Sequence, residues 1–131
     1  MEPGVPLARK LGLKPGLRIV LVNCPDGWDA IPGASLDTGT GPADVIIAFF
    51  TAAVEIPATL PDLARRIYSA GAIWAAWPRR AGGHRSDITD NVIRSHALPL
   101  GLVDVKVAAI DDDWSGLRLV WRVSNRGISP E

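Results

Sequence analysis

The chain has 131 residues, enough for one domain with a substantial core. Lys plus Arg and Asp plus Glu both number 14, so the formal net charge is zero, and 47% of the residues are hydrophobic. This balance disfavours non-specific nucleic-acid binding, which relies on a basic surface. The longest apolar run, residues 45–54, is too short to span a bilayer, so we expect no membrane contact.

Cys24 is the single cysteine, so neither an internal disulfide nor a cysteine-based zinc site can form. The first residues lack the basic-then-apolar pattern of a signal peptide. We therefore expect a reduced, cytoplasmic protein with a single domain over residues 1–131. We expect residues 1–16 to form a lead-in segment and residues 124–131 to form a frayed tail.

Three continuous apolar runs predict strands that are buried on both faces of a sheet. They cover residues 17–23, 43–50 and 72–77. A further short strand is expected near residues 34–36, inside a loop-rich region.

Residues 59–70 predict the first helix, with Thr59 as its cap and Gly71 ending it in a left-handed conformation. Pro61 falls in the first turn, where proline is tolerated, and Asp62 adds an early acid. Apolar residues recur at helical spacing and predict one buried face. They are Leu60, Leu63, Ala64 and Ile67.

A second helix is expected from Asp87 to about Ala97, capped by Ser86 or Asp87. Residues 102–110 and 117–123 then alternate in character, and the short connection between them predicts an antiparallel hairpin. Strands that alternate with helices imply right-handed crossovers and parallel pairing. The sequence therefore predicts a three-layer α/β fold with a mostly parallel sheet and a C-terminal antiparallel hairpin.

A basic, glycine-containing loop follows the strand at residues 72–77 and precedes the second helix. Ligands of open α/β sheets gather at the carboxyl ends of strands, and a helix start favours anions. We predict a site for a small anionic ligand here. Its candidate residues are Arg79, Arg80, His84, Arg85, Asp87 and Ile88. In the alternative interpretation, the arginines pair with Asp87 and Asp90, or with the acids at residues 111–113.

The consecutive acids Asp111, Asp112 and Asp113 have two interpretations. A metal site needs oxygen ligands spaced around a loop, and three adjacent side chains diverge. A hairpin turn in which an Asp side chain binds local backbone amides explains them better. We assign no metal site.

Cys24 follows the first strand, where a nucleophile can be displayed, but only His84 and His96 are available as bases. Neither is near it in sequence, and we assign no catalytic residue. Trp28 and Trp114 fall in expected loops, where they either stack on a ligand, cover the core or anchor a partner. If both are exposed, they predict a homo-oligomer.

Two segments resemble the second half of a Rossmann-like methyltransferase. Residues 71–78 (GAIWAAWP) resemble the strand after its central crossover, and residues 101–105 (GLVDV) resemble the start of its closing hairpin. Together with residues 10–16 (KLGLKPG) and 112–116 (DDWSG), they make the chain similar to a family of small bacterial proteins, a domain of unknown function. The resemblance implies a truncated methyltransferase architecture and no assigned activity.

Methyltransferases of this kind hold their cofactor with a glycine-rich loop after the first strand. Here the corresponding loop, residues 23–28, has one glycine and a proline, and no Asn-Pro-Pro-aromatic motif follows Phe50. The resemblance implies that any remaining cofactor contacts come from Asn23, Asp26, Gly27 and Thr51.

Three functions remain open at this point. The first is a non-catalytic domain without a cofactor that binds a small anionic ligand or a protein partner. The second is an S-adenosylmethionine-dependent methyltransferase with a reduced cofactor site. The third is a homo-oligomeric structural module.

Overall fold

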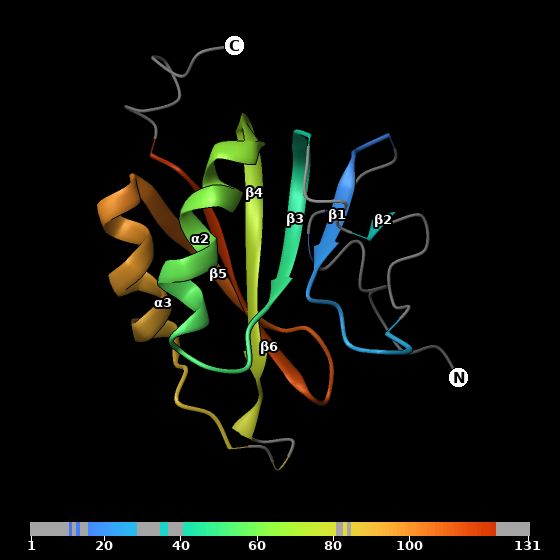
Figure 1. The fold of residues 1–131 in the computed structure, drawn as a ribbon, viewed down its shortest axis with the longest axis vertical. Helices are drawn as coiled ribbons and strands as arrows, with labels where there is room; N and C mark the ends of the chain where they lie inside the picture. The colour runs from blue at the N-terminus through green and yellow to red at the C-terminus, as the bar shows by residue number, and fades with distance from the viewer. Residues whose placement is uncertain are drawn as a thin grey trace.

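The computed structural model describes residues 11, 13, 16–28, 35–36, 41–80, 83 and 85–122 (Figure 1). The tail expected at residues 124–131 and most of the lead-in segment lie outside these residues.

The centre of the fold is a six-stranded sheet with the order β2-β1-β3-β4-β6-β5. Its strands are β1 (Ile19–Val22), β2 (Ser35–Leu36), β3 (Ala43–Phe49), β4 (Ile67–Pro78), β5 (Leu102–Ala109) and β6 (Trp114–Trp121). The first four pair in parallel, and β6 is antiparallel to both β4 and β5. This confirms the predicted, mostly parallel sheet with a closing hairpin, including the short second strand.

The two central strands bury side chains on both faces, as their continuous apolar sequences predict. In β3, Ile46 packs on one face and Ile47 on the other, and both are fully buried. In β4, Ile73 and Trp74 alternate in the same way. These strands form the rigid base from which the loops at their carboxyl ends project.

Helices α2 (Glu55–Arg66) and α3 (Asp90–Ala97), with the short 3₁₀ turn η2 (Leu98–Leu100), cover one face of the sheet (Figure 1). Their buried side chains meet those of the strands in one apolar cluster. The helices contribute Ile56, Leu60, Leu63, Ala64, Ile93 and Ala97.

The expected bounds of the first helix are wrong at both ends. The helix begins at Glu55, so Thr59 is an interior residue. The Glu55 carboxylate accepts hydrogen bonds from the backbone N–H groups of Thr51 and Ala52 at 2.8 and 3.3 Å. The chain leaves the helix at Arg66 and enters β4 directly. Gly71 therefore ends no helix. It lies within β4, where an added Cβ would be 2.8 Å from the carbonyl oxygen of Asp44.

The expected cap of the second helix is also wrong. Helix α3 begins at Asp90, and the hydroxyl of Thr89 accepts a hydrogen bond from the N–H of Val92 at 3.3 Å. Ser86 and Asp87 have other hydrogen-bond partners. The Ser86 hydroxyl accepts from the N–H of Ile88 at 3.0 Å, and the Asp87 carboxylate accepts from the N–H of Ala53 at 2.8 Å. The loop before α3 is thus tied to the turn before α2.

The opposite face of the sheet carries a second apolar cluster, which includes Leu21, Ile47, Phe49 and Trp74. Leu11 is buried in it, and its carbonyl oxygen accepts a hydrogen bond from the indole N–H of Trp74 at 3.0 Å. Among the described residues, this third layer is built from segments outside the helices.

Candidate functional site

The topology of the sheet marks one edge as the place where a ligand is expected. The arrows of β1, β3 and β4 point to the same edge in Figure 1. Strand β1 has β2 on one side and β3 on the other, so the strand order reverses between β1 and β3. In open α/β sheets, ligands bind in the crevice at such a switch point. Residues 23–28 and 50–53 border this crevice.

Three aromatic side chains meet at this switch point. The rings of Trp28 and Phe49 pack edge-to-face with centroids 5.0 Å apart, and those of Phe49 and Trp114 do the same at 5.0 Å. The indole N–H of Trp28 donates to a carboxylate oxygen of Asp111 at 3.0 Å. This aromatic cluster (Trp28, Phe49 and Trp114) joins the loop after β1, the end of β3 and the closing hairpin.

The loop at the switch point differs from the open, glycine-rich loop that holds an adenosyl cofactor. The loop after β1 folds on itself, because the N–H of Trp28 donates to the carbonyl oxygen of Pro25 at 3.1 Å. Its indole, rather than open glycine backbone, lies against Phe49. Of the predicted cofactor contacts, Asn23, Asp26 and Gly27 are exposed, and the N–H and hydroxyl of Thr51 are bound by Glu55. The chain thus places a closed turn and the aromatic cluster at this switch point.

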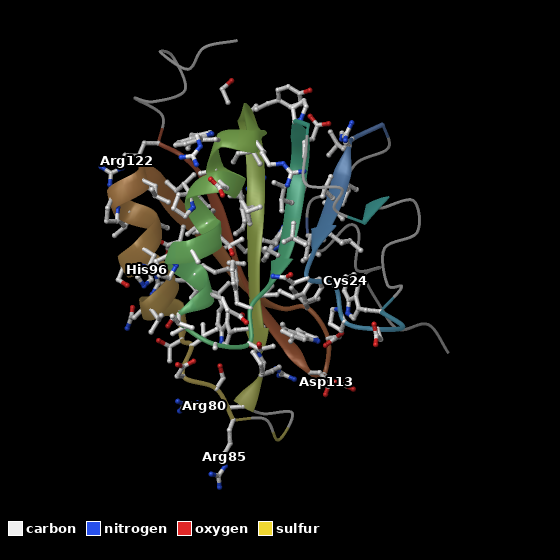
Figure 2. The ribbon with its side chains drawn as sticks, in the orientation of Figure 1. Cys24, Arg80, Arg85, His96, Asp113 and Arg122 are labelled. Carbon is white, nitrogen blue, oxygen red and sulfur yellow. The ribbon has the colours of Figure 1, made fainter. Side chains whose placement is uncertain are left out.

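Cys24 lies in the same loop, beside two backbone carbonyl groups. Its sulfur is 3.6 Å from the carbonyl oxygens of Pro25 and Trp28, either of which can accept a hydrogen bond from the thiol. Burial, and then the nearby charge of Asp26, raise the pKa of the Cys24 thiol. His96 lies on α3, well away from Cys24 (Figure 2), and His84 lies outside the described residues. The structure brings no base to this thiol among the residues it describes.

The acids of the hairpin form a turn, as the sequence analysis favoured. One carboxylate oxygen of Asp111 accepts hydrogen bonds from the N–H of Asp113 at 2.8 Å and of Trp114 at 2.9 Å. The other accepts the indole N–H of Trp28. Within the described ranges, no three His, Cys, Asp or Glu side chains gather as a metal site would require.

A pocket of about 350 Å³ opens at the carboxyl end of β4. It is lined by Trp77, Arg79, Arg80, Ile88, Thr89, Asp90 and Ser115. We call it the β4–α3 pocket, because it lies between the end of β4 and the start of α3. It brings together three of the predicted anion contacts, Arg79, Arg80 and Ile88. Arg85 and Asp87 do not line it, and Figure 2 shows the Arg85 side chain extending away from the sheet.

The arginines of this pocket have no internal counter-ion among the described residues. Neither guanidinium, of Arg79 or of Arg80, has a hydrogen bond or ion pair with that part of the chain. The acids expected to pair with them have other partners: Asp87 binds the N–H of Ala53, and Asp90 binds Arg94 at 3.1 Å. The backbone N–H of Arg79 donates to the carbonyl oxygen of Asp113 at 2.8 Å, which fixes the strand end beside the hairpin.

Other residues of this pocket, Thr89 and Ser115 among them, were not predicted as ligand contacts. Thr89 followed by Asp90 is a typical helix start, and that signal was present in the sequence. Ser115 enters the site because it pairs with Trp77 across β4 and β6. The register of these two strands brings the residues together, and no local sequence signal predicts it.

Trp28 and Trp114 are half-buried in the aromatic cluster, where they cover the core. The homo-oligomer that their exposure would indicate stays a prediction. In the described part of the chain, no helix has the length and apolar character needed to cross a membrane.

No protein-family model and no curated protein sequence matches the chain. Solved structures do match. Magnesium protoporphyrin IX methyltransferase (ChlM) from Synechocystis PCC 6803, solved with bound SAM, aligns with a TM-score of 0.62 at 14% identity over 88% of this chain and 74% of that chain. A protein of the NADB-Rossmann superfamily from Streptococcus agalactiae aligns with a TM-score of 0.55 at 10% identity, over 92% and 69%.

The complex of LepI with SAM aligns with a TM-score of 0.56 at 11% identity, over 88% of this chain. The chain spans about half or less of the length of several of these proteins, 51% of a second ChlM structure and 39% of LepI. At these identities the likeness shows the fold alone. The protein has a truncated, methyltransferase-like Rossmann fold.

Proposed function

We propose that this chain is a non-catalytic domain that binds a small anionic ligand in the β4–α3 pocket. The observation that carries the proposal is the pair of guanidinium groups, Arg79 and Arg80, that line the pocket without a counter-ion among the described residues. A guanidinium presents a planar fork of donors that matches carboxylate and phosphate oxygens. The pocket also faces the start of α3, whose dipole favours negative charge.

The position of the pocket supports the same proposal. It lies at the carboxyl end of a parallel strand, where ligands of this fold class gather. The aromatic cluster occupies the switch point on the other face of the sheet, so the two places are separate. Arg85, Asp87 and His84 stay predicted contacts for a ligand that extends beyond the pocket.

Thermal melting with inorganic phosphate, sulfate and organic anions tests the proposal. At ten times Kd, ligand binding stabilises a protein by about 1.4 kcal/mol. For a domain of this size, that raises Tm by roughly 5 °C. The double substitution Arg79→Ala with Arg80→Ala should abolish the shift. Arg65→Ala is the matched control, because Arg65 is exposed on α2 and pairs with Asp62. If no anion raises the Tm of the intact protein, the proposal is wrong.

A second candidate function is an S-adenosylmethionine-dependent methyltransferase with a reduced cofactor site. The fold of the structures solved with bound SAM favours it. Its cofactor contacts would be Asn23, Asp26, Gly27 and Thr51, and the aromatic cluster weighs against it. Calorimetry with S-adenosylmethionine and its demethylated product separates the two functions, since only the methyltransferase should bind them at millimolar concentration.

Three further expectations remain proposals. They are membership of the family of small bacterial proteins, a cytoplasmic location, and self-association through Trp28 and Trp114. Light scattering at increasing concentration tests the last of these, and a constant monomer mass would contradict it.

A further inference from the structure

Trp77 is a nearly buried tryptophan whose indole N–H has no partner in the described part of the chain. The residue is 9% exposed and packs in the apolar cluster beneath the helices. Every fully buried side-chain nitrogen or oxygen in the described residues has a hydrogen-bond partner, so the unpaired indole nitrogen of Trp77 must reach the surface. Trp77 also lines the β4–α3 pocket, which is a surface that this donor can reach.

Trp74, on the same strand, shows the usual alternative. It is fully buried, and its indole N–H donates to the carbonyl oxygen of Leu11 at 3.0 Å. A buried indole N–H generally finds a partner, because an unsatisfied donor costs stability. The contrast indicates that the partner of the Trp77 N–H comes from outside the described residues, as solvent or as a ligand.

The polar groups that line the pocket are mainly donors. Arg79 and Arg80 can only donate. The Ser115 hydroxyl, opposite Trp77 in the sheet, has no hydrogen bond with the described residues. Thr89 uses its oxygen to accept from Val92, which leaves its hydroxyl proton to donate.

Among the described lining residues, Asp90 supplies the one carboxylate, and it is already engaged. It accepts from the guanidinium of Arg94 at 3.1 Å and from the N–H of Asn91 at 2.9 Å. The acceptors for the donors of this pocket are therefore solvent or a bound ligand.

The number of these donors distinguishes two kinds of anion. A carboxylate has two oxygens in one plane, and a single guanidinium fork satisfies it. A phosphomonoester has three terminal oxygens in a tetrahedral arrangement and carries about −1.5 to −2 charges at neutral pH. The pocket offers two cations together with donors from β4, β6 and the start of α3. Building on the proposed function, we infer that the ligand is a phosphomonoester and that the Trp77 indole N–H donates to its phosphate group.

Phenyl phosphate and benzoate test this inference, because they share a ring and differ in the acid group. Calorimetric titration of the full chain should give a Kd for phenyl phosphate about tenfold lower than for benzoate, the difference expected for one additional charged hydrogen bond. Trp77→Phe, which keeps an aromatic ring and removes the N–H, should raise the Kd for phenyl phosphate about tenfold and leave that for benzoate nearly unchanged. Arg65→Ala should change neither.

The indole N–H resonances give a direct readout that does not depend on affinity. The chain has 5 tryptophans, so their indole signals can be separated in a ¹H–¹⁵N spectrum. Saturation with phenyl phosphate should move the Trp77 signal downfield and leave that of Trp74 in place. The Trp77 signal is identified by its absence from the spectrum of Trp77→Phe. If that variant does not fold, through-bond experiments on the wild-type chain assign the signal instead.

The outcomes separate this inference from the proposed function. If phenyl phosphate binds through Arg79 and Arg80 but the Trp77 signal stays in place, the role of Trp77 is wrong and the anion site stands. If benzoate binds as tightly as phenyl phosphate, the phosphomonoester class is wrong. If phenyl phosphate, benzoate and inorganic phosphate all fail to bind, both the inference and the proposed function are wrong.

Discussion

Substituting Trp28 by Ala should destabilise the fold by about 3 kcal/mol. Removing a fully buried tryptophan costs about 3–5 kcal/mol. Trp28 is half-buried, so its packing contributes roughly 2 kcal/mol, including the edge-to-face contact with Phe49. The hydrogen bond from its indole N–H to Asp111 adds about 1 kcal/mol.

Urea unfolding, followed by circular dichroism, measures this free energy. Trp28→Phe keeps a ring against Phe49 and removes the N–H, so it should lose only about 1 kcal/mol. A double-mutant cycle with Asp111→Asn then isolates the hydrogen bond. If Trp28→Ala stays within about 0.5 kcal/mol of the wild type, the indole makes no significant contribution to packing, and the aromatic cluster does not stabilise the switch point.

Three other predictions follow from the same structure. Gly71→Ala should destabilise the protein by about 2 kcal/mol in a urea titration, because its Cβ would be 2.8 Å from a backbone oxygen of β3; an unchanged midpoint would contradict that packing. The Asp104 carboxylate has a lowered pKa, chiefly because of its hydrogen bond with Arg94. Because the pKa of Asp104 is lower in the folded than in the unfolded chain, its ionised carboxylate stabilises the fold at any pH above the unfolded pKa. This stabilisation is lost as the pH falls through the pKa of the folded state. Asp104→Asn should therefore lower Tm at neutral pH and have little effect on Tm in strong acid. An equal loss of Tm at the two pH values would contradict a stabilising ion pair between Arg94 and Asp104. Burial, and then the charge of Asp26, raise the pKa of the Cys24 thiol. At neutral pH, iodoacetamide should therefore alkylate the native protein more slowly than the unfolded chain, which mass spectrometry can follow. Equal rates would show an accessible, unperturbed thiol.

The strands were predictable because their signal is local. In β3 and β4, continuous runs of apolar residues specify burial on both faces without reference to the rest of the chain. The helix starts were less predictable, since they depend on contacts between segments. Glu55 begins α2 by binding the preceding turn, and Asp87 is drawn away from α3 by the N–H of Ala53.

Some residues of the candidate site were likewise predictable from local sequence, and others were not. Arg79 and Arg80 were predicted because Pro78 ends an apolar run and a basic loop follows. Ser115 was missed because only the register of β4 and β6 places it beside Trp77. The aromatic cluster was also missed, because Trp28 and Trp114 lie far apart in sequence and are joined through Phe49 and Asp111.

The most direct test of this account is a calorimetric comparison of inorganic phosphate and S-adenosylmethionine on the same preparation. The account predicts binding heat with phosphate that disappears when Arg79 and Arg80 are both replaced by Ala, and no binding heat with S-adenosylmethionine. Saturable binding of S-adenosylmethionine, unaffected by loss of the two arginines, together with no response to phosphate, would contradict it.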